Sequence, residues 1–218
     1  MKSIKAVIFD LDDTLIDRAL TFCKYSHAFI RERFTSGELP DTIDNMLQYM
    51  IALDNNGHCN KYEFYGSLIE KWKMKNCTAQ QLRDCYVESF QKYTTPYEDT
   101  KKVLEYLVPK YKLGIITNGS SKVQNGKIDS VKIRDFFTSI IIGEEVGLYK
   151  PDKRVFLFAC NTLDVEPSEA VYVGDYYIKD IEGAKNAGLE AIWYPHGANI
   201  DQPYDYVINR LSEIVNIL

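Results

Sequence analysis

The sequence lacks the features that mark secreted, membrane-spanning and nucleic-acid-binding proteins. Its five cysteines are odd in number and include no C-x-x-C pair, so we expect a reducing, cytoplasmic location rather than a disulfide framework. No apolar stretch approaches the length of a membrane span, and the chain's start runs straight into an expected strand, so we expect no signal peptide. With 26 Lys and Arg against 31 Asp and Glu, the net charge of −5 predicts neither a nucleic acid polymer nor an anionic membrane as a partner.

Histidine is also scarce. The three histidines, His27, His58 and His196, are too scattered along the chain to suggest a metal site.

At 218 residues, of which 45% are hydrophobic and 26% charged, the chain can form one large domain or a core with an insertion. The oligomeric state is not predictable from this sequence.

Acidic residues, by contrast, are concentrated directly after the first apolar run. The run Ile4–Phe9 indicates a buried parallel strand, and the segment Asp10–Thr14 (DLDDT) follows it at once. Two like charges about 4 Å apart cost roughly 4 kcal/mol at an effective dielectric of about 20, and a hard divalent cation would offset that cost. An acidic turn that closes a hairpin is the alternative interpretation of this segment alone.

Two further segments could bind a phosphoryl group. Residues 117–121 (TNGSS) follow the apolar run Leu113–Ile116, and their hydroxyl, amide and backbone N–H groups could hold an anion or simply cap a helix. Lys150 precedes Pro151, which we expect in the first turn of a helix that runs to about Asn161. Lys150 is then either a solvated surface charge or a cation that positions a phosphate beside an aspartate.

The last acidic segment follows another expected strand, Ala170–Val173. Gly174 permits a close approach of the backbone, while Asp175 and Asp180 bring two more carboxylates to the same edge of the sheet. The alternative for Asp180 is a cap or first-turn residue of the helix that follows.

Together, the four segments resemble the haloacid dehalogenase-like superfamily, in its phosphatase branch with a helical cap inserted after the first motif. The residues that carry the resemblance are Asp10–Thr14, Thr117–Gly119, Lys150–Asp152, and Gly174–Asp175 with Asp180. The resemblance extends to about Gly188. It implies an α/β fold with a doubly wound, mainly parallel Rossmann-like sheet and an inserted α-helical cap, and the alternation of expected strands and helices agrees with that fold.

The resemblance also implies roles for the carboxylates. Asp10 would be the nucleophile that forms an aspartyl-phosphate, and Asp12 the general acid and base. Mg²⁺ would be held by the Asp10 carboxylate, the Asp12 backbone carbonyl and Asp175, with Asp180 acting through water.

The same resemblance implies a binding site for the phosphoryl group. Thr117 and Lys150 would bind its oxygens, together with backbone N–H groups near Asn118. Dehalogenases of the superfamily lack the second aspartate, so Asp12 argues against cleavage of a carbon–halogen bond. Tyr176 and Tyr177 depart from the small residue that many members have after Gly174-Asp175, and we expect these aromatic side chains to pack against the core.

Between Thr14 and Thr117 the pattern changes to helical periodicity. Aromatic stripes predict a helix-bundle core; they comprise Phe22, Tyr25, Phe29 and Ile30, then Phe64, Tyr65, Leu68, Ile69 and Trp72, then Leu82, Tyr86 and Phe90. We therefore predict a catalytic core of residues 1–16 and 96–218 and a helical cap of residues 17–95 that sets substrate specificity. Arg18, Asn56 and His58 are candidates for contacts with the leaving group, although each could equally be a solvated turn residue.

The predicted function is Mg²⁺-dependent hydrolysis of a small phosphorylated metabolite, a phosphomonoester, through an aspartyl-phosphate. A phosphomutase of the β-phosphoglucomutase type is the alternative, because it shares the first chemical step. A non-catalytic regulatory module would be expected to have lost Asp10, Asp12, Lys150 or Asp175, and all four are present.

Overall fold

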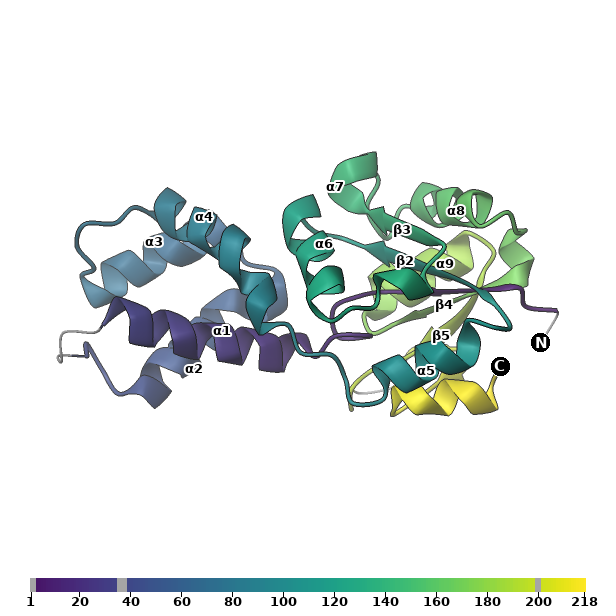
Figure 1. Ribbon diagram of the computed structural model, residues 1–218, viewed down its shortest axis with the longest axis horizontal. Helices are drawn as coiled ribbons and strands as arrows, with labels where there is room; N and C mark the ends of the chain where they lie inside the picture. The colour runs from purple at the N-terminus through teal and green to yellow at the C-terminus, as the bar shows by residue number, and fades with distance from the viewer. Residues whose placement is uncertain (1–2, 35–38, 199–200) are drawn as a thin grey trace. The chain divides into compact units, whose positions relative to one another are not determined.

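The apolar run near the N-terminus forms the strand β1, which lies inside a six-stranded parallel sheet (Figure 1). The strand order is β3-β2-β1-β4-β5-β6. This computed structural model describes residues 3–34, 39–198 and 201–218. The strands are β1 (Ala6–Phe9), β2 (Lys112–Thr117), β3 (Ser139–Ile142), β4 (Ala170–Gly174), β5 (Glu190–Trp193) and β6 (Tyr206–Val207).

Helices connect these strands. They are α5 (Thr100–Leu107), α6 (Ser121–Ser130), α7 (Gly143–Val146), α8 (Lys153–Thr162) and α9 (Gly183–Asn186), with 3-10 turns at Arg134–Phe136, Pro167–Glu169 and Leu211–Asn216 and a π-helix at Tyr177–Glu182. The long segment between β1 and β2 contains α1 (Arg18–Arg33), α2 (Ile43–Asp54), α3 (Lys61–Trp72) and α4 (Ala79–Ser89), with 3-10 turns at Asn55–Gly57 and Phe90–Tyr93. The expected α/β fold with a parallel sheet and a helical insert is confirmed.

Side chains of β1 alternate between two hydrophobic cores, one on each face of the sheet. Val7 and Phe9 pack with α5 and with the C-terminal 3-10 turn, which lie side by side (Figure 1). Ala6 and Ile8 pack with α8 and α9 on the opposite face. Because both faces are covered, the strand is apolar throughout, and the first polar residue after its carboxyl end is Asp10.

The chain divides into two compact units, which we call the core unit (Met1–Asp17 and Pro96–Leu218) and the helical unit (Arg18–Thr95). The aromatic stripes of the helical unit are buried, as the helical periodicity predicted, except that Ile69 is half-buried. Tyr25 and Phe90 pack edge to face with ring centroids 5.3 Å apart, and Phe64 and Tyr65 do the same at 5.0 Å. The helical unit therefore has a hydrophobic core of its own.

The helix after Lys150 begins later than the sequence predicted. The prediction that Pro151 occupies its first turn is wrong, because α8 begins at Lys153 and Asp152 is its N-cap. The Asp152 carboxylate accepts a hydrogen bond from the backbone N–H of Arg154 at 2.9 Å. This capping bond satisfies one of the donors that a helix leaves unpaired at its start.

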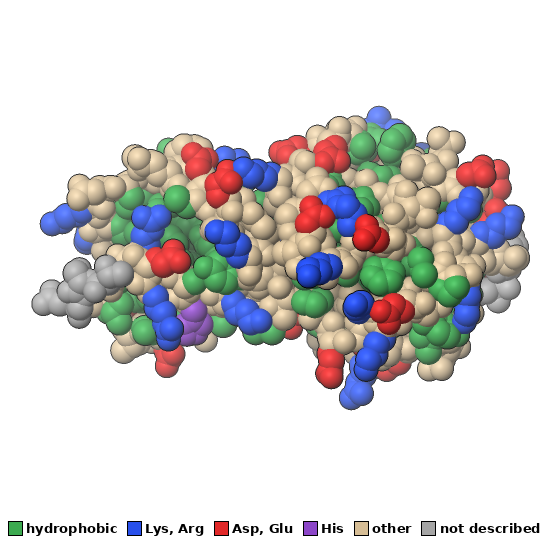
Figure 2. Space-filling model, viewed as in Figure 1, with side chains coloured by type: hydrophobic (Ala, Val, Ile, Leu, Met, Phe, Trp, Pro, Cys, Tyr) green, Lys and Arg blue, Asp and Glu red, His purple; other side chains and the backbone are tan. Residues whose placement is uncertain are grey.

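Charged side chains of both signs are interspersed on the face drawn in Figure 2. Over the described residues, none of the helices combines the length and the apolar character that crossing a membrane requires.

Candidate active site

The carboxyl ends of three neighbouring strands bring the sequence motifs to one edge of the sheet. Phe9 of β1 lies opposite Ile115 of β2 on one side and Val173 of β4 on the other. The backbone N–H of Asp10 continues this pattern with a hydrogen bond to the Val173 carbonyl at 2.9 Å. Parallel pairing therefore aligns Asp10 with the segments that follow β2 and β4.

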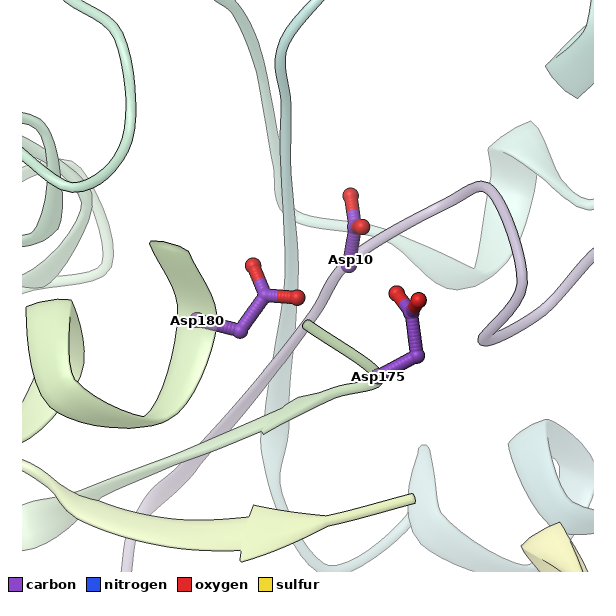
Figure 3. Close-up of side chains that lie close together, drawn as sticks. All are labelled: Asp10, Asp175 and Asp180. Atoms are coloured by element: carbon purple, nitrogen blue, oxygen red, sulfur yellow. The ribbon is translucent and has the colours of Figure 1, made fainter. Parts of the chain in front are cut away.

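Three carboxylates meet at this edge. One oxygen from each of Asp10, Asp175 and Asp180 lies within 4.8 Å of the others. In Figure 3, Asp175 lies at the end of a strand, Asp180 on a helical turn and Asp10 on a separate segment of the chain beside them. Burial, followed by the charges of Asp10 and Asp180, raises the pKa of Asp175 to about 9. Burial likewise raises the pKa of Asp10 to about 7, against the opposing effect of Lys150.

These residues fit a hard divalent cation. Their donor atoms are carboxylate oxygens, which such ions prefer, and a cation would supply the charge that buried carboxylates need in order to ionise. The cluster could therefore hold a metal ion at the carboxyl edge of β1 and β4.

Lys150 is buried against the same cluster. Its ammonium lies 2.7 Å from Asp10 and 2.7 Å from Asp180, and it donates to the Tyr172 hydroxyl at 2.8 Å. Burial alone would lower the pKa of Lys150, but the two carboxylates raise it more, so the net pKa is above its usual value. The alternative that Lys150 is a solvated surface charge is wrong, since the residue is only 4% exposed.

Asn118 fixes the main chain at Lys150. Its side-chain amide donates to the Lys150 carbonyl at 2.8 Å, and its side-chain oxygen accepts from the Lys150 N–H at 2.9 Å. This two-way contact joins the segment after β2 to the segment before α8. It accounts for the position of Lys150, while the expected contact of an anion with backbone N–H groups near Asn118 stays a prediction.

Asp180 has little freedom to move. It is fully buried, and its carboxylate accepts a hydrogen bond from the backbone N–H of Tyr176 at 3.0 Å. A Cβ at Gly174 would lie 2.6 Å from the Asp180 carboxylate, so only glycine fits there. Nearby, the Trp193 indole donates to the Asp175 carbonyl at 2.8 Å.

The side chain of Asp12 is held by α6. The Lys127 ammonium contacts both of its carboxylate oxygens, at 2.7 and 2.8 Å. The side-chain amide of Gln124 donates to Asp12 at 3.0 Å and to the Thr117 hydroxyl at 2.6 Å. Sequence reasoning missed Gln124 and Lys127, and the available signal was weak: two polar residues three apart between the apolar positions Val123 and Ile128.

Two of the three specificity candidates lie together in the helical unit. The guanidinium of Arg18 pairs with Asp54 at 2.7 Å and donates to the Asn56 side-chain oxygen at 3.4 Å. Asp54 also pairs with Lys61 at 2.5 Å and accepts from the Gly57 N–H at 2.8 Å. Arg18 is thus buried within its own unit, whereas Asn56 and His58 are exposed. Sequence reasoning missed Asp54 and Lys61.

Known proteins share this sequence pattern over most of its length. The sequence model of a family described as "Haloacid dehalogenase-like hydrolase" matches residues 7–194. Glyceraldehyde 3-phosphate phosphatase of Methanopyrus kandleri is 30% identical over 99% of this chain and 97% of its own. Pyrimidine 5'-nucleotidase YjjG of Escherichia coli is 28% identical over 97% of this chain and 96% of its own.

The fold has a close structural counterpart as well. The putative HAD-hydrolase YfnB from Bacillus subtilis, whose crystal structure is bound to magnesium, superimposes with a TM-score of 0.79. It is 22% identical in sequence, and the match covers 99% of both chains. This likeness establishes the shared fold.

Proposed function

The chain belongs to the haloacid dehalogenase-like hydrolase family and is a phosphatase of that family, and we propose that it hydrolyses a small phosphomonoester through an aspartyl-phosphate on Asp10. The contact of the buried Lys150 ammonium with Asp10 and Asp180, beside the third carboxylate of Asp175, carries the proposal. Phosphoryl transfer requires a nucleophile and positive charge beside the phosphoryl oxygens, and this strand edge brings together a carboxylate, a buried ammonium and three carboxylates that fit a metal ion.

Asp10 is the nucleophile in this proposal. An oxygen of its carboxylate attacks phosphorus, the bond between phosphorus and the leaving oxygen breaks, and that oxygen takes a proton from the Asp12 carboxyl. The Lys150 ammonium, 2.7 Å from Asp10, lies where it can offset charge on the phosphoryl oxygens. The Thr117 hydroxyl and backbone N–H groups near Asn118 complete the binding of the phosphoryl group.

Asp12 then reverses its role. Its carboxylate takes a proton from water, the water oxygen attacks phosphorus, and the bond to Asp10 breaks to release inorganic phosphate and the Asp10 carboxylate. The two aspartates sit in different surroundings, which this division of roles needs: Asp10 contacts Lys150 in the acidic cluster, and Asp12 contacts Lys127 on α6.

Mg²⁺ is the cofactor we propose. Asp10, Asp175 and Asp180 would hold it, together with the backbone carbonyl of Asp12, and Asp180 would act through water. When bound, the ion supplies positive charge that keeps the carboxylates ionised and offsets charge on the phosphoryl oxygens.

The helical unit is the proposed site of substrate choice, with Arg18, Asn56 and His58 as the candidate residues. The relatives described above are named for glyceraldehyde 3-phosphate and for pyrimidine 5'-nucleotides, so both substrate types belong in a test. A segment that covers the reacting groups can select the leaving group and exclude water.

Phosphate release from a panel of phosphorylated metabolites tests the proposal. The panel includes triose phosphates, sugar phosphates and nucleoside monophosphates, each assayed with Mg²⁺ and with a chelator. We expect metal-dependent release from the wild type and none from Asp10→Asn. Asp164→Asn is the matched control, because Asp164 is exposed and its φ of 52° suits asparagine.

Substantial turnover by a folded Asp10→Asn variant would contradict the assignment of the nucleophile. An isomeric sugar phosphate formed in place of free phosphate would identify a phosphomutase instead.

A further inference from the structure

We propose that Gln124 and Lys127 of α6 are positioning residues that orient the Asp12 carboxylate and the Thr117 hydroxyl for phosphoryl transfer. This inference rests on the proposed function, because it assigns no chemistry of its own to α6. It concerns how the side chain of Asp12 is held in one orientation while Asp10 gains and then loses the phosphoryl group.

The two side chains lie where their residue types are rarely found. Gln124 is 2% exposed and Lys127 is 3% exposed, and side chains of these types are mostly solvent-exposed in proteins. Their spacing of three residues puts them on one face of α6. A lysine that is buried needs a charged partner, and here that partner is Asp12, which lies 115 residues away in the sequence.

Lys127 restrains the orientation of the Asp12 carboxylate. Contacts of 2.7 and 2.8 Å from one ammonium to both oxygens hold the carboxylate group from one side. Rotation about the side chain would break at least one of these contacts, and each is a charge-assisted hydrogen bond. The Asp12 carboxylate is therefore held by Lys127 of α6, whereas Lys150 forms ion pairs with Asp10 and Asp180.

Gln124 links the acid–base group to the phosphate-binding hydroxyl. In the ionised form that takes a proton from water, the Asp12 carboxylate can only accept hydrogen bonds, so Gln124 must turn its NH₂ group toward Asp12. The same NH₂ group donates to the Thr117 hydroxyl oxygen at 2.6 Å. Since that oxygen accepts from Gln124, the hydroxyl hydrogen of Thr117 is directed elsewhere and can donate to a phosphoryl oxygen.

Gly119 makes room for this arrangement. A Cβ at position 119 would lie 2.9 Å from both Cγ and Cδ of Gln124, so a side chain there would displace Gln124 from this position. Gln124 therefore packs directly over the turn that follows β2. The packing of Gln124 against this turn therefore explains why position 119 is a glycine.

A transient-kinetic comparison of Lys127→Met with the wild type tests the inference. The substrate is 4-nitrophenyl phosphate, whose leaving group needs little help from a general acid. We expect the initial burst of nitrophenolate to persist, while steady-state turnover falls by about 100-fold, the lower end of the range for general acid–base catalysis. Acid quenching should then trap aspartyl-phosphate that waits for an activated water.

Three controls separate positioning from a merely structural role. Lys102→Met removes the same charge from an exposed site on α5 and should leave the kinetics unchanged. Lys127→Arg keeps the charge and should recover most of the lost turnover. Gln124→Met retains Lys127 and should raise KM about tenfold by loosening Thr117, with a smaller change in kcat.

A double-mutant cycle gives the decisive result. Adding Lys127→Met to Asp12→Asn should cost no further activity, because the residue to be positioned is already disabled. A burst and a steady state that fall together, or losses that multiply in the double variant, would overturn the inference.

Failure of the underlying function would look different. If Asp12→Asn itself turned over at the wild-type rate, the proposed acid–base role would be wrong. If Asp12→Asn were slow while Lys127→Met and Gln124→Met were both normal, only the positioning inference would fail. Should Lys127→Met not fold, the same cycle is run with Lys127→Gln, which removes the charge but keeps a polar side chain.

Discussion

Lys150 and Tyr172 show how one buried ammonium is held between two carboxylates. The Tyr172 hydroxyl accepts from Lys150 at 2.8 Å and donates to the Ile116 carbonyl at 3.1 Å, so it ties the lysine to β2. Burial, followed by the nearby charges of Asp180 and Asp10, raises the pKa of Tyr172 well above its usual value. The hydroxyl therefore stays neutral and serves as a fixed hydrogen-bonding group.

Replacing Tyr172 with phenylalanine tests this role. We expect Tyr172→Phe to lower the free energy of unfolding by about 1 kcal/mol, because the buried ammonium loses one of its acceptors. Activity should fall while metal dependence stays. Denaturant unfolding measures the first effect, and Tyr62→Phe, at a side chain that is 56% exposed, is the control. An unchanged unfolding energy would show that water replaces the hydroxyl.

At the scale of elements, the turn between α2 and α3 depends on one buried carboxylate. Asp54 is 1% exposed and contacts Arg18, Lys61 and the backbone of Gly57. A Cβ at Gly57 would lie 2.8 Å from the Arg18 guanidinium, so the turn packs directly on that side chain. The ion pairs therefore fix the turn that carries Asn56 and leads into His58.

Removing this carboxylate should destabilise the helical unit. We expect Asp54→Asn to cost about 3–5 kcal/mol, because the buried Arg18 and the half-buried Lys61 would keep their charges without their partner. Asp44→Asn, at an exposed residue of α2, is the control for loss of a negative charge. Chemical denaturation at neutral pH measures the difference.

The ion pairs of Asp54 with Arg18 and Lys61 also predict how the stability of the protein changes with pH. Burial alone would raise the pKa of Asp54, but the charges of Arg18 and Lys61 lower it more, so the net pKa is below its usual value. A lowered pKa means that the unfolded chain binds the proton first, so this stabilisation is complete above pH ~4 and is lost as the pH falls further. The stability gap between wild type and Asp54→Asn should therefore narrow below pH ~4. A gap that widened there would contradict the assignment.

The elements that could be predicted from the sequence are those marked by a short apolar run and the polar residues directly after it. Three of the four motifs follow an apolar run, and parallel strands must end at one edge, so the gathering of Asp10, Thr117 and Asp175 was predictable. The contact of Lys127 with Asp12 was not, because it joins residues 115 apart and α6 has no strong amphipathic pattern. The start of α8 was misjudged because the capping bond of Asp152 outweighed the preference of Pro151 for a first helical turn.

At the scale of the whole molecule, the core unit and the helical unit each have their own hydrophobic packing, so we expect two unfolding events. The chain's two tryptophans fall one in each unit, Trp72 in the helical unit and Trp193 in the core unit. Trp193 also donates to the Asp175 carbonyl, so its fluorescence should respond to the acidic cluster. Single-tryptophan variants can therefore follow each unit by itself.

Added Mg²⁺ should stabilise the two units unequally. At a concentration about 100 times its dissociation constant, we expect the ion to add about 2.7 kcal/mol to the unfolding transition reported by Trp193. The transition reported by Trp72 should not move. Thermal unfolding of Trp72→Phe and Trp193→Phe, each with Mg²⁺ and with chelator, gives the two curves. Equal shifts in both would show that the units unfold as one.

The position of β1 in the sheet has a consequence for how the protein is made. The helical unit is one uninterrupted stretch, so it can bury its aromatic side chains while the ribosome is still adding residues. β1 emerges first but pairs with β2, which begins at Lys112, and with β4, which begins at Ala170. Most of the chain must therefore be synthesised before Asp10 can contact Asp175 and Asp180. A nascent chain that stops short of β4 contains Asp10, the proposed nucleophile, but lacks Asp175 and Asp180, so we expect it to be inactive.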